Sequence, residues 1–222
     1  MNRVAVVIPA HNEASRIGDV VSRALPYADF VIVVDDGSDD GTSASLLPAS
    51  PRVIFLRHPI NMGKGAALKT GCAAAVLIGA DTIVTIDGDG QHPPAHIPAV
   101  LRHMEQNRFD AVFTFRQGGD RMPFVRRLGN RAVNFGAMTL FGFRSRDIWC
   151  GFRAFRADAL PRMPWRNRDY SGEIQMALAA GRNGVRYGEF PIPALYPAAA
   201  KGVHIAHGLK LLAQMAWWRL SS

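Results

Sequence analysis

The feature that most constrains this chain is a regular alternation, in its first half, of short β-branched runs and segments with helical periodicity. The apolar runs have the length of buried strands, and the segments between them repeat apolar residues at helical spacing. Continuous apolar strands separated by helices predict an α/β fold with a mainly parallel central sheet and helices on both faces. The predicted strands are Val4–Pro9, Phe30–Asp36, Val53–His58, Asp81–Asp87 and Asp110–Phe115, and the predicted helices are Glu13–Leu25, a short Thr42–Leu47, Gly65–Ile78 and Pro94–Asn107.

The composition is that of one folded domain. Apolar residues make up 48% of the 222, which excludes a disordered or collagen-like chain. No apolar run approaches the ~20 residues of a membrane-spanning helix. Cys72 and Cys150 have neither metal-binding spacing nor the pattern of a disulfide framework. No repeat or linker interrupts the sequence, so we expect a single domain over residues 1–222, in a reducing compartment.

Positive charge is concentrated in one segment. The formal net charge is +8, and residues 116–168 contain twelve Arg, three Asp and no Lys or Glu. Such a local excess needs an anionic partner or a solvated surface, and nucleic acid, a phosphorylated substrate and an anionic lipid surface all qualify. The use of Arg rather than Lys favours bidentate phosphate recognition. Against nucleic acid, the arginines are not interleaved with aromatic stacking residues, and an acidic loop would repel its backbone.

Polar loops follow the first, second and fourth predicted strands. They are Pro9–Glu13, Val34–Thr42 and Ile86–His92. Ligands of such sheets bind outside the carboxyl ends of the strands, so three polar loops at one edge predict a binding site there.

The last of these loops has the pattern of a metal site. Asp87 and Asp89 are two residues apart at a strand end, which turns both carboxylates to the same side. Clustered carboxylates repel each other unless a cation lies between them, and oxygen ligands suit Mg²⁺ or Mn²⁺. Gln91 can add a carbonyl oxygen. An EF-hand does not fit, since Pro98 stands at its twelfth position. An acidic glycine-rich turn without a metal is the structural alternative.

The other loops exclude two common nucleotide-binding patterns. No G-x-G-x-x-G follows the first strand, and Gly63-Lys64-Gly65 lacks the spacing and the Ser/Thr of a P-loop. Asp35-Asp36-Gly37-Ser38 is either a turn that caps the next helix or a carboxylate contact to a nucleobase or ribose. A nucleotide held through a metal on its diphosphate is therefore the remaining interpretation.

Taken together, these motifs resemble the family 2 glycosyltransferases, in the branch of polyprenyl-phosphate (dolichyl-phosphate) mannosyl- and glucosyltransferases. The resemblance covers roughly residues 3 to 205 and is carried by Val7–Glu13, Val34–Thr42, Asn61–Gly65, Asp87–Pro94, Cys150–Arg156 and Gly172–Ile174. It implies a GT-A fold, a nucleotide-sugar donor, a divalent metal (Mn²⁺ or Mg²⁺) and inversion at the anomeric carbon. It also implies a nucleotide-sugar and metal-binding half, residues 1–115, and an acceptor-binding half, residues 116–222.

The resemblance assigns roles position by position. The residues that would line the nucleoside pocket are Pro9, His11, Glu13, Val34 and Asp36. Those that would contact the diphosphate are Asp87, Gly88 and Asp89, and those that would bind the metal are Asp87, Asp89 and Gln91. Arg116 falls at a phosphate-binding arginine, Arg127 near a second one, and Lys201 at a late lysine that closes over the site. Leu195 and Tyr196 stand where the family carries a further arginine, a departure on the acceptor side.

The implied reaction moves a hexose from a GDP-mannose-type or UDP-glucose-type donor to a lipid phosphate. A phosphate nucleophile is already anionic and needs little base catalysis. If the acceptor is instead a hydroxyl of another lipid or secondary metabolite, a carboxylate must take its proton. Glu173, at the start of a predicted Ser171–Ala180 helix, is then the candidate, although an acid there also complements the helix dipole. An alternative from another functional class is a non-catalytic basic module that binds nucleotide or nucleic acid.

Two segments bear on membrane contact. Phe124–Phe143 and His207–Leu220 mix aromatic and apolar residues with basic ones, as helices at a lipid interface do. Core packing with one solvated face is the alternative. Given a lipid acceptor, we expect a cytoplasmic protein in peripheral contact with the inner face of the cell membrane.

Overall fold

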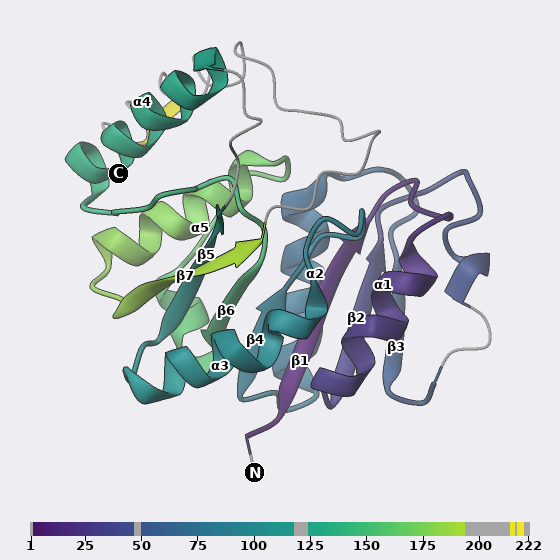
Figure 1. Cartoon of the computed structure of the whole chain (residues 1–222). Helices are drawn as coiled ribbons and strands as arrows, with labels where there is room; N and C mark the ends of the chain where they lie inside the picture. Colours follow the sequence, from purple (N-terminus) through teal and green to yellow (C-terminus); the bar gives the residue numbers. More distant parts are fainter. Residues whose placement is uncertain (1, 47–49, 118–123, 194–213, 216, 220–222) are drawn as a thin grey trace.

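The computed structural model describes residues 2–46, 50–117, 124–193, 214–215 and 217–219, with side chains in the stretch from 124 described from residue 133 onward. One seven-stranded sheet runs through it, in the order β3-β2-β1-β4-β6-β5-β7 (Figure 1). The strands are β1 (Val4–Ala10), β2 (Phe30–Asp35), β3 (Val53–Arg57), β4 (Thr82–Thr85), β5 (Ala111–Gln117), β6 (Arg153–Arg156) and β7 (Tyr187–Pro193). Only β6 is antiparallel to its neighbours, β4 and β5, which confirms the predicted mainly parallel sheet.

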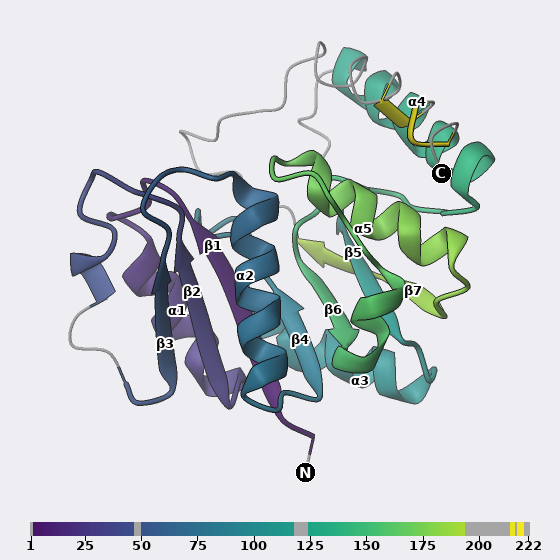
Figure 2. The same cartoon turned by 180° about the vertical axis from the view of Figure 1, so that it is seen from behind.

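Helices cover both faces of the sheet, as predicted. The α-helices are α1 (Ile17–Ala24), α2 (Lys64–Leu77), α3 (Ile97–Gln106), α4 (Phe124–Phe141) and α5 (Ser171–Arg182), and the 3-10 turns are η1 (Leu25–Tyr27), η2 (Ala44–Leu46), η3 (Pro94–His96) and η4 (Ala157–Arg162). Helices α1 and α3 lie on one face, and α2 and α5 on the other (Figures 1 and 2). No described helix is both long and apolar enough to cross a bilayer.

Alternate residues of the central strands pack into two separate hydrophobic cores, one on each face of the sheet. In β1, Val6 and Ile8 pack with α1 and α3, whereas Ala5 and Val7 pack with α2, α4 and α5. Because successive side chains of a strand point to opposite faces, the unbroken apolar run of β1 is what a strand covered on both sides requires. Met215, in the short described part of the C-terminal segment, belongs to the core on the side of α2, α4 and α5. The described residues around it lie beside α4 (Figure 1).

The first predicted helix begins later than its sequence suggests, at Ile17 rather than Glu13. The preceding residues are held to the loop after β2: the backbone N–H of Asn12 donates to Ser38 Oγ at 2.9 Å, and that of Glu13 to Thr42 Oγ1 at 2.9 Å. Asn12 also takes a positive φ of 57°, which no helix accepts. The contacts with the second loop hold the residues before the helix, and the N–H groups of Arg16 and Ile17 close a single turn onto Glu13 O, both at 2.9 Å, before the regular helix begins.

Candidate active site

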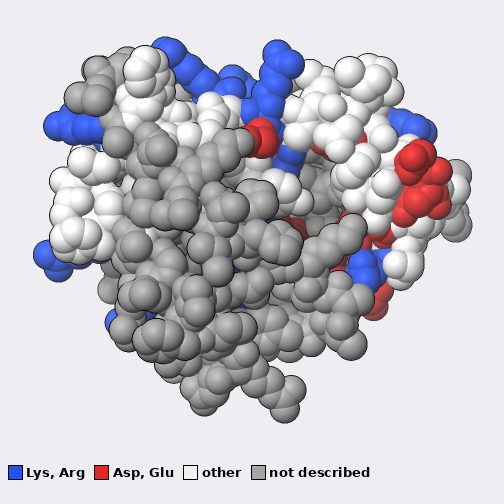
Figure 3. Space-filling model, turned by 90° about the horizontal axis from the view of Figure 1, so that it is seen from above, with Lys and Arg blue, Asp and Glu red and all other residues white. Residues whose placement is uncertain are grey.

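Three loops meet at the carboxyl edge of the sheet, as the strand pattern predicted. Strand β1 pairs with both β2 and β4, so the loops that follow these strands are neighbours. The first two loops are tied together by the hydrogen bonds of Asn12 and Glu13 and by a third, from Ala14 N to Asp40 Oδ2 at 3.0 Å. Viewed from this edge, basic side chains gather along one side, acidic ones at another, and red surface is visible in a recess between them (Figure 3).

The nucleoside-pocket candidates divide into buried and accessible residues. Pro9 and Val34 lie buried within strands, whereas the His11 side chain is exposed and Glu13 is half-buried and paired with Arg16 at 3.0 Å. The carboxylate of Asp36 is buried and accepts three hydrogen bonds, from His58 Nδ1 at 2.7 Å, Met62 N at 2.9 Å and Gly63 N at 2.7 Å. Asp36 thus holds the backbone of the loop that leads into α2.

Asp35, its neighbour, supports the loop after β2. Its buried carboxylate accepts hydrogen bonds from Ser38 N at 3.0 Å and Ser43 Oγ at 2.6 Å, with Arg57 Nε 3.5 Å away. Burial alone would raise the pKa of Asp35, but the hydrogen bonds from Ser38 and Ser43 outweigh it and lower the pKa below its ordinary value of 3.8.

We therefore expect Asp35→Asn to lower the free energy of unfolding by about 1–3 kcal/mol at neutral pH, because a buried charge-assisted network loses its acceptor. A pKa depressed in the folded state gives stability that is present above the ordinary value and is lost as the pH falls through the folded-state value. Urea unfolding of wild type and variant should therefore converge as the pH falls below 3.8. The exposed Asp39→Asn is the control, and a gap that does not change with pH would contradict the assignment.

The aspartate loop after β4 is organised around Asp87. Its Oδ1 lies 2.5 Å from Lys64 Nζ, and its Oδ2 lies 3.5 Å from His92 Nδ1. Gly151, at the turn before β6, packs against the carboxylate so closely that a Cβ there would be 2.6 Å from Oδ1. Burial alone would raise the pKa of Asp87, but the Lys64 ammonium outweighs it, and the pKa lies far below its ordinary value. Asp87 is therefore an ionised carboxylate that its neighbours hold in one position.

Lys64 joins this loop to α5. Its Nζ lies 2.7 Å from Glu173 Oε2 as well as 2.5 Å from Asp87. Burial alone would lower the pKa of Lys64, but the two carboxylates outweigh it and raise the pKa above its ordinary value. The ring of Tyr170, next to α5, lies 5.5 Å from the same ammonium. One buried cation thus connects residues that are more than 80 positions apart.

Asp89 and Gln91, two of the predicted metal ligands, contact each other. Asp89 accepts hydrogen bonds from Gln91 N at 3.0 Å and from Gln91 Nε2 at 2.6 Å. Hard divalent cations take such carboxylate and amide oxygens, so these side chains fit Mg²⁺ or Mn²⁺ in kind. Among the described residues no group of three or more His, Cys, Asp or Glu side chains is set to hold a metal.

The acceptor-side candidates lie in part beyond the described residues. Arg116, at the end of β5, makes a bidentate ion pair with Asp147, with Nε 2.6 Å and Nη2 3.0 Å from the two carboxylate oxygens. This pairing orients the guanidinium at the carboxyl edge. The side chain of Arg127 and the whole of Lys201 lie outside the part of the chain that the structure describes.

The sequence interpretation missed Lys64 as a site residue. One feature of the sequence could have indicated it. Lys64 is the first residue of α2 and follows Gly63, which has a φ of 95°, although the helix dipole disfavours a cation at a helix N-terminus.

Arg153 was also missed. It is buried in β6, has no acidic partner among the described residues, and donates to the backbone oxygens of Cys150, Ile148 and Glu173. It thereby fixes the turn that carries Gly151.

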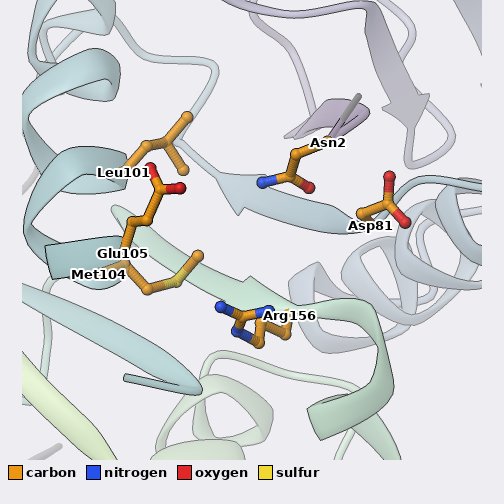
Figure 4. A pocket seen from close by; sticks show the side chains of 6 residues that line it. All are labelled: Asn2, Asp81, Leu101, Met104, Glu105 and Arg156. Carbon is orange, nitrogen blue, oxygen red and sulfur yellow. The ribbon is translucent and has the colours of Figure 1, made fainter. Parts of the chain in front are cut away.

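A cavity of about 350 Å³ lies at the opposite, amino-terminal edge of the sheet. Its lining comes from residues that precede β1 and β4, from α3 and from the end of the antiparallel β6, namely Asn2, Asp81, Leu101, Met104, Glu105 and Arg156 (Figure 4). None of the predicted site residues that the structure describes lines it.

Comparison with known proteins agrees with this architecture. Residues 5–163 match the family model described as Glycosyl transferase family 2. The UDP-N-acetylglucosamine–dolichyl-phosphate N-acetylglucosaminyltransferase of Methanococcus voltae is 30% identical, over 94% of this chain and 92% of that protein. The undecaprenyl-phosphate mannosyltransferase of Micrococcus luteus is also 30% identical, over 86% of this chain and 82% of the relative.

Among solved structures, glucosyl-3-phosphoglycerate synthase from Mycobacterium tuberculosis shares the fold. Its TM-score is 0.74 at 21% identity, over 98% of this chain and 80% of that one. That protein was crystallised with Mn²⁺, uridine diphosphate and glucosyl-3-phosphoglycerate. The likeness confirms the predicted GT-A architecture, with its mainly parallel sheet in a single domain.

Proposed function

This chain belongs to glycosyl transferase family 2, and from that premise we propose that it is an inverting, metal-dependent hexosyltransferase. Its donor is a nucleotide sugar of the GDP-mannose or UDP-glucose class, and its acceptor is a polyprenyl-phosphate-type lipid carrier. The relatives named above, which match over most of their length, carry names of transfer to dolichyl or undecaprenyl phosphate. Those names support the acceptor class, and the residues of this chain support the chemistry.

On the donor side, the proposal assigns the carboxyl edge of β1, β2 and β4 to the nucleotide. The accessible His11 and the half-buried Glu13 contact the nucleoside directly. Asp36 acts through the loop into α2 that its carboxylate holds. Gly88 lets the loop after β4 pack against the end of β1, since a Cβ there would already be 3.2 Å from Pro9 O, and its bare backbone faces the proposed diphosphate without a side chain.

A divalent cation would be held by Asp89 and Gln91, with Asp87 beside them. When bound, such a cation neutralises charge on the departing nucleoside diphosphate. The carboxylate and amide oxygens of these residues support this assignment, and diphosphate oxygens complete the shell of Mg²⁺ or Mn²⁺ in many nucleotide sites.

The observation that carries the choice of acceptor is the ion pair of Glu173. This is the carboxylate that a hydroxyl acceptor would need as a base, and its Oε2 is held 2.7 Å from Lys64 Nζ in a buried position. A carboxylate oxygen that is already occupied by a buried ammonium is not free to receive the proton of a hydroxyl acceptor. A phosphate acceptor needs no base, since its oxygen already carries the attacking electron pair.

In the proposed reaction an acceptor phosphate oxygen bonds to the anomeric carbon on the face opposite the diphosphate. The bond from that carbon to the diphosphate oxygen breaks, the nucleoside diphosphate leaves with the electron pair, and the configuration inverts. Arg116, oriented by Asp147, holds the incoming phosphate in line, and Arg127 and Lys201 complete the cationic side of the site.

A transfer screen tests this proposal. GDP- and UDP-sugars are incubated with Mn²⁺ or Mg²⁺ and with a short-chain polyprenyl phosphate or the matching polyprenol. We expect one donor class to react and the sugar to appear on the phosphate, with inverted configuration by NMR. Transfer to the polyprenol alone would favour the hydroxyl-acceptor alternative, and no transfer from any donor would contradict the proposed activity.

The proposal includes peripheral contact with a membrane through α4 and the C-terminal segment. These elements share a core through Ala137 and Met215, while Phe135 and Trp217 are 63% and 68% exposed on their outer sides. Aromatic side chains on an amphipathic surface insert into the lipid interface. This arrangement would place the site beside the carrier it uses.

We expect the double variant Phe135→Ser/Trp217→Ser to lower the fraction of protein bound to phosphatidylglycerol-containing vesicles by about fivefold or more. Both side chains are exposed, so the fold should stay intact. Co-sedimentation is the measurement, and Leu77→Ser, at an 85% exposed position of α2, is the control. Unchanged sedimentation of the double variant would remove these residues from the membrane contact.

A further inference from the structure

Lys64 occupies a position that ordinary helix and burial preferences disfavour twice. It is the first residue of α2, where the helix dipole repels a cation, and its side chain is only 15% exposed. A buried ammonium persists only where opposite charges and hydrogen bonds compensate its lost hydration. Asp87 and Glu173 supply both.

The surrounding backbone keeps the ammonium in place. A Cβ on Gly63 would lie 2.5 Å from Arg168 O, and one on Gly65 would lie 2.5 Å from Asn167 O. The Ala66 N–H donates to Arg168 O at 3.0 Å, and the Trp165 indole donates to Gly65 O at 2.9 Å. The first turn of α2 is thus packed against the segment before α5, so Lys64 has little freedom to withdraw from the two carboxylates.

From this geometry we propose that Lys64 is a positioning residue that acts as a built-in counter-cation for Asp87. The inference deepens the proposed function, on which it rests, because it concerns how that site admits its metal. Lys64 Nζ occupies Asp87 Oδ1 at 2.5 Å and shares its single positive charge with Glu173. The site therefore offers a free dication one negative charge fewer than its carboxylates alone would give, and one oxygen of Asp87 is already taken.

The consequence is an order of binding. A free dication meets Asp89 and Gln91, while Asp87 Oδ1 is already paired with Lys64, and so it binds weakly. A dication that arrives together with a nucleoside diphosphate brings its own oxygens and charge, and it needs only the remaining protein ligands. Lys64 thereby makes occupation by the metal depend on the nucleotide.

Manganese binding without donor, acceptor or turnover tests this. The electron paramagnetic resonance signal of free Mn²⁺ is followed while protein is added, for wild type, Lys64→Met and the control Lys69→Met. Lys69 lies exposed on the same helix, so its loss removes the same charge from outside the site. We expect Lys64→Met to lower the Kd of Mn²⁺ alone by about tenfold or more, and Lys69→Met to leave it unchanged.

A second variant covers the case in which Lys64→Met does not fold because Glu173 is left unpaired. Lys64→Met/Glu173→Gln removes both charges of that pair, and we expect it to bind Mn²⁺ alone more tightly than Glu173→Gln does. Adding GDP or UDP should raise the Mn²⁺ affinity of wild type by a larger factor than that of the lysine variants. Circular dichroism reports whether each variant is folded.

Equal or weaker Mn²⁺ binding by folded lysine variants would overturn the inference, as would wild-type binding that nucleotide does not strengthen. The proposed function fails separately. If the lysine variants gain Mn²⁺ affinity and no donor reacts in the transfer screen, the counter-cation role stands and the transferase proposal falls. If transfer is observed and the Mn²⁺ affinities do not change, the reverse holds.

Discussion

Asp89→Ala is expected to lower kcat/KM for the nucleotide-sugar donor by about 10³-fold or more, and to abolish Mn²⁺-dependent donor binding. In the described residues Asp89 makes its hydrogen bonds only within its own loop, to Gln91. Its loss therefore removes a ligand for the metal without opening a core. Isothermal calorimetry with donor and Mn²⁺, together with steady-state kinetics, measures both effects.

The control for this prediction is Asp158→Ala. Asp158 is an exposed acidic residue in η4, which follows the antiparallel β6 and so lies toward the amino-terminal edge of the sheet. Its removal changes the net charge equally and should leave kcat/KM within about twofold. Donor binding by Asp89→Ala that equals that of wild type would show that the aspartate loop is a turn without a metal function.

Gly151→Ala is expected to have the second largest effect. The added methyl would lie 2.6 Å from Asp87 Oδ1 and 3.0 Å from Oδ2, so the carboxylate must shift from the position in which it contacts Lys64. A displacement of this size in a positioned group costs about 10²-fold in rate. We also expect overpacking to lower the free energy of unfolding by about 1–3 kcal/mol. Kinetics at saturating donor and urea unfolding separate the two effects.

Gly184→Ala separates the carboxylate displacement from general backbone strain. Gly184 has a φ of 65° and no atom within 4 Å of an added Cβ, so alanine there meets strain but no neighbour. A stability loss of about 1 kcal/mol with unchanged kcat is expected. If Gly151→Ala behaved in the same way, the close approach of Gly151 to Asp87 would have no role in catalysis.

The strands that could be predicted best are those whose burial produces a simple pattern of apolar residues in the sequence. β1 and β2 are covered on both faces and are continuous apolar runs, so their existence and nearly their bounds could be read directly. β6 and β7 could not. β6 is four residues long with an arginine at each end, and the sheet-edge strand β7 contains Pro191 and Pro193, which argue against a strand in any sequence.

The candidate site divides in the same way. Asp87 and Asp89 could be predicted to lie in one loop at the sheet edge. The two-residue period of a strand does not set the direction of their side chains, however, because β4 ends at Thr85, and Asp87 contacts Lys64 while Asp89 contacts Gln91. The contacts of Lys64 could not be predicted, because they join α2, the loop after β4 and α5, whose approach is set by packing at Gly63, Gly65 and Gly172. The role of Asp36 was hidden for a related reason, since its partners lie 22 to 27 residues away.

In the proposed complex, the aspartate loop at the carboxyl edge of the sheet holds a dication together with the diphosphate of a sugar donor. Anomalous diffraction from crystals grown with Mn²⁺ and GDP or UDP locates both. We expect a manganese peak bonded to a carboxylate oxygen of Asp89 and to the diphosphate. A nucleotide bound elsewhere, for example in the cavity beside Arg156, or a manganese peak away from Asp89, would contradict this arrangement.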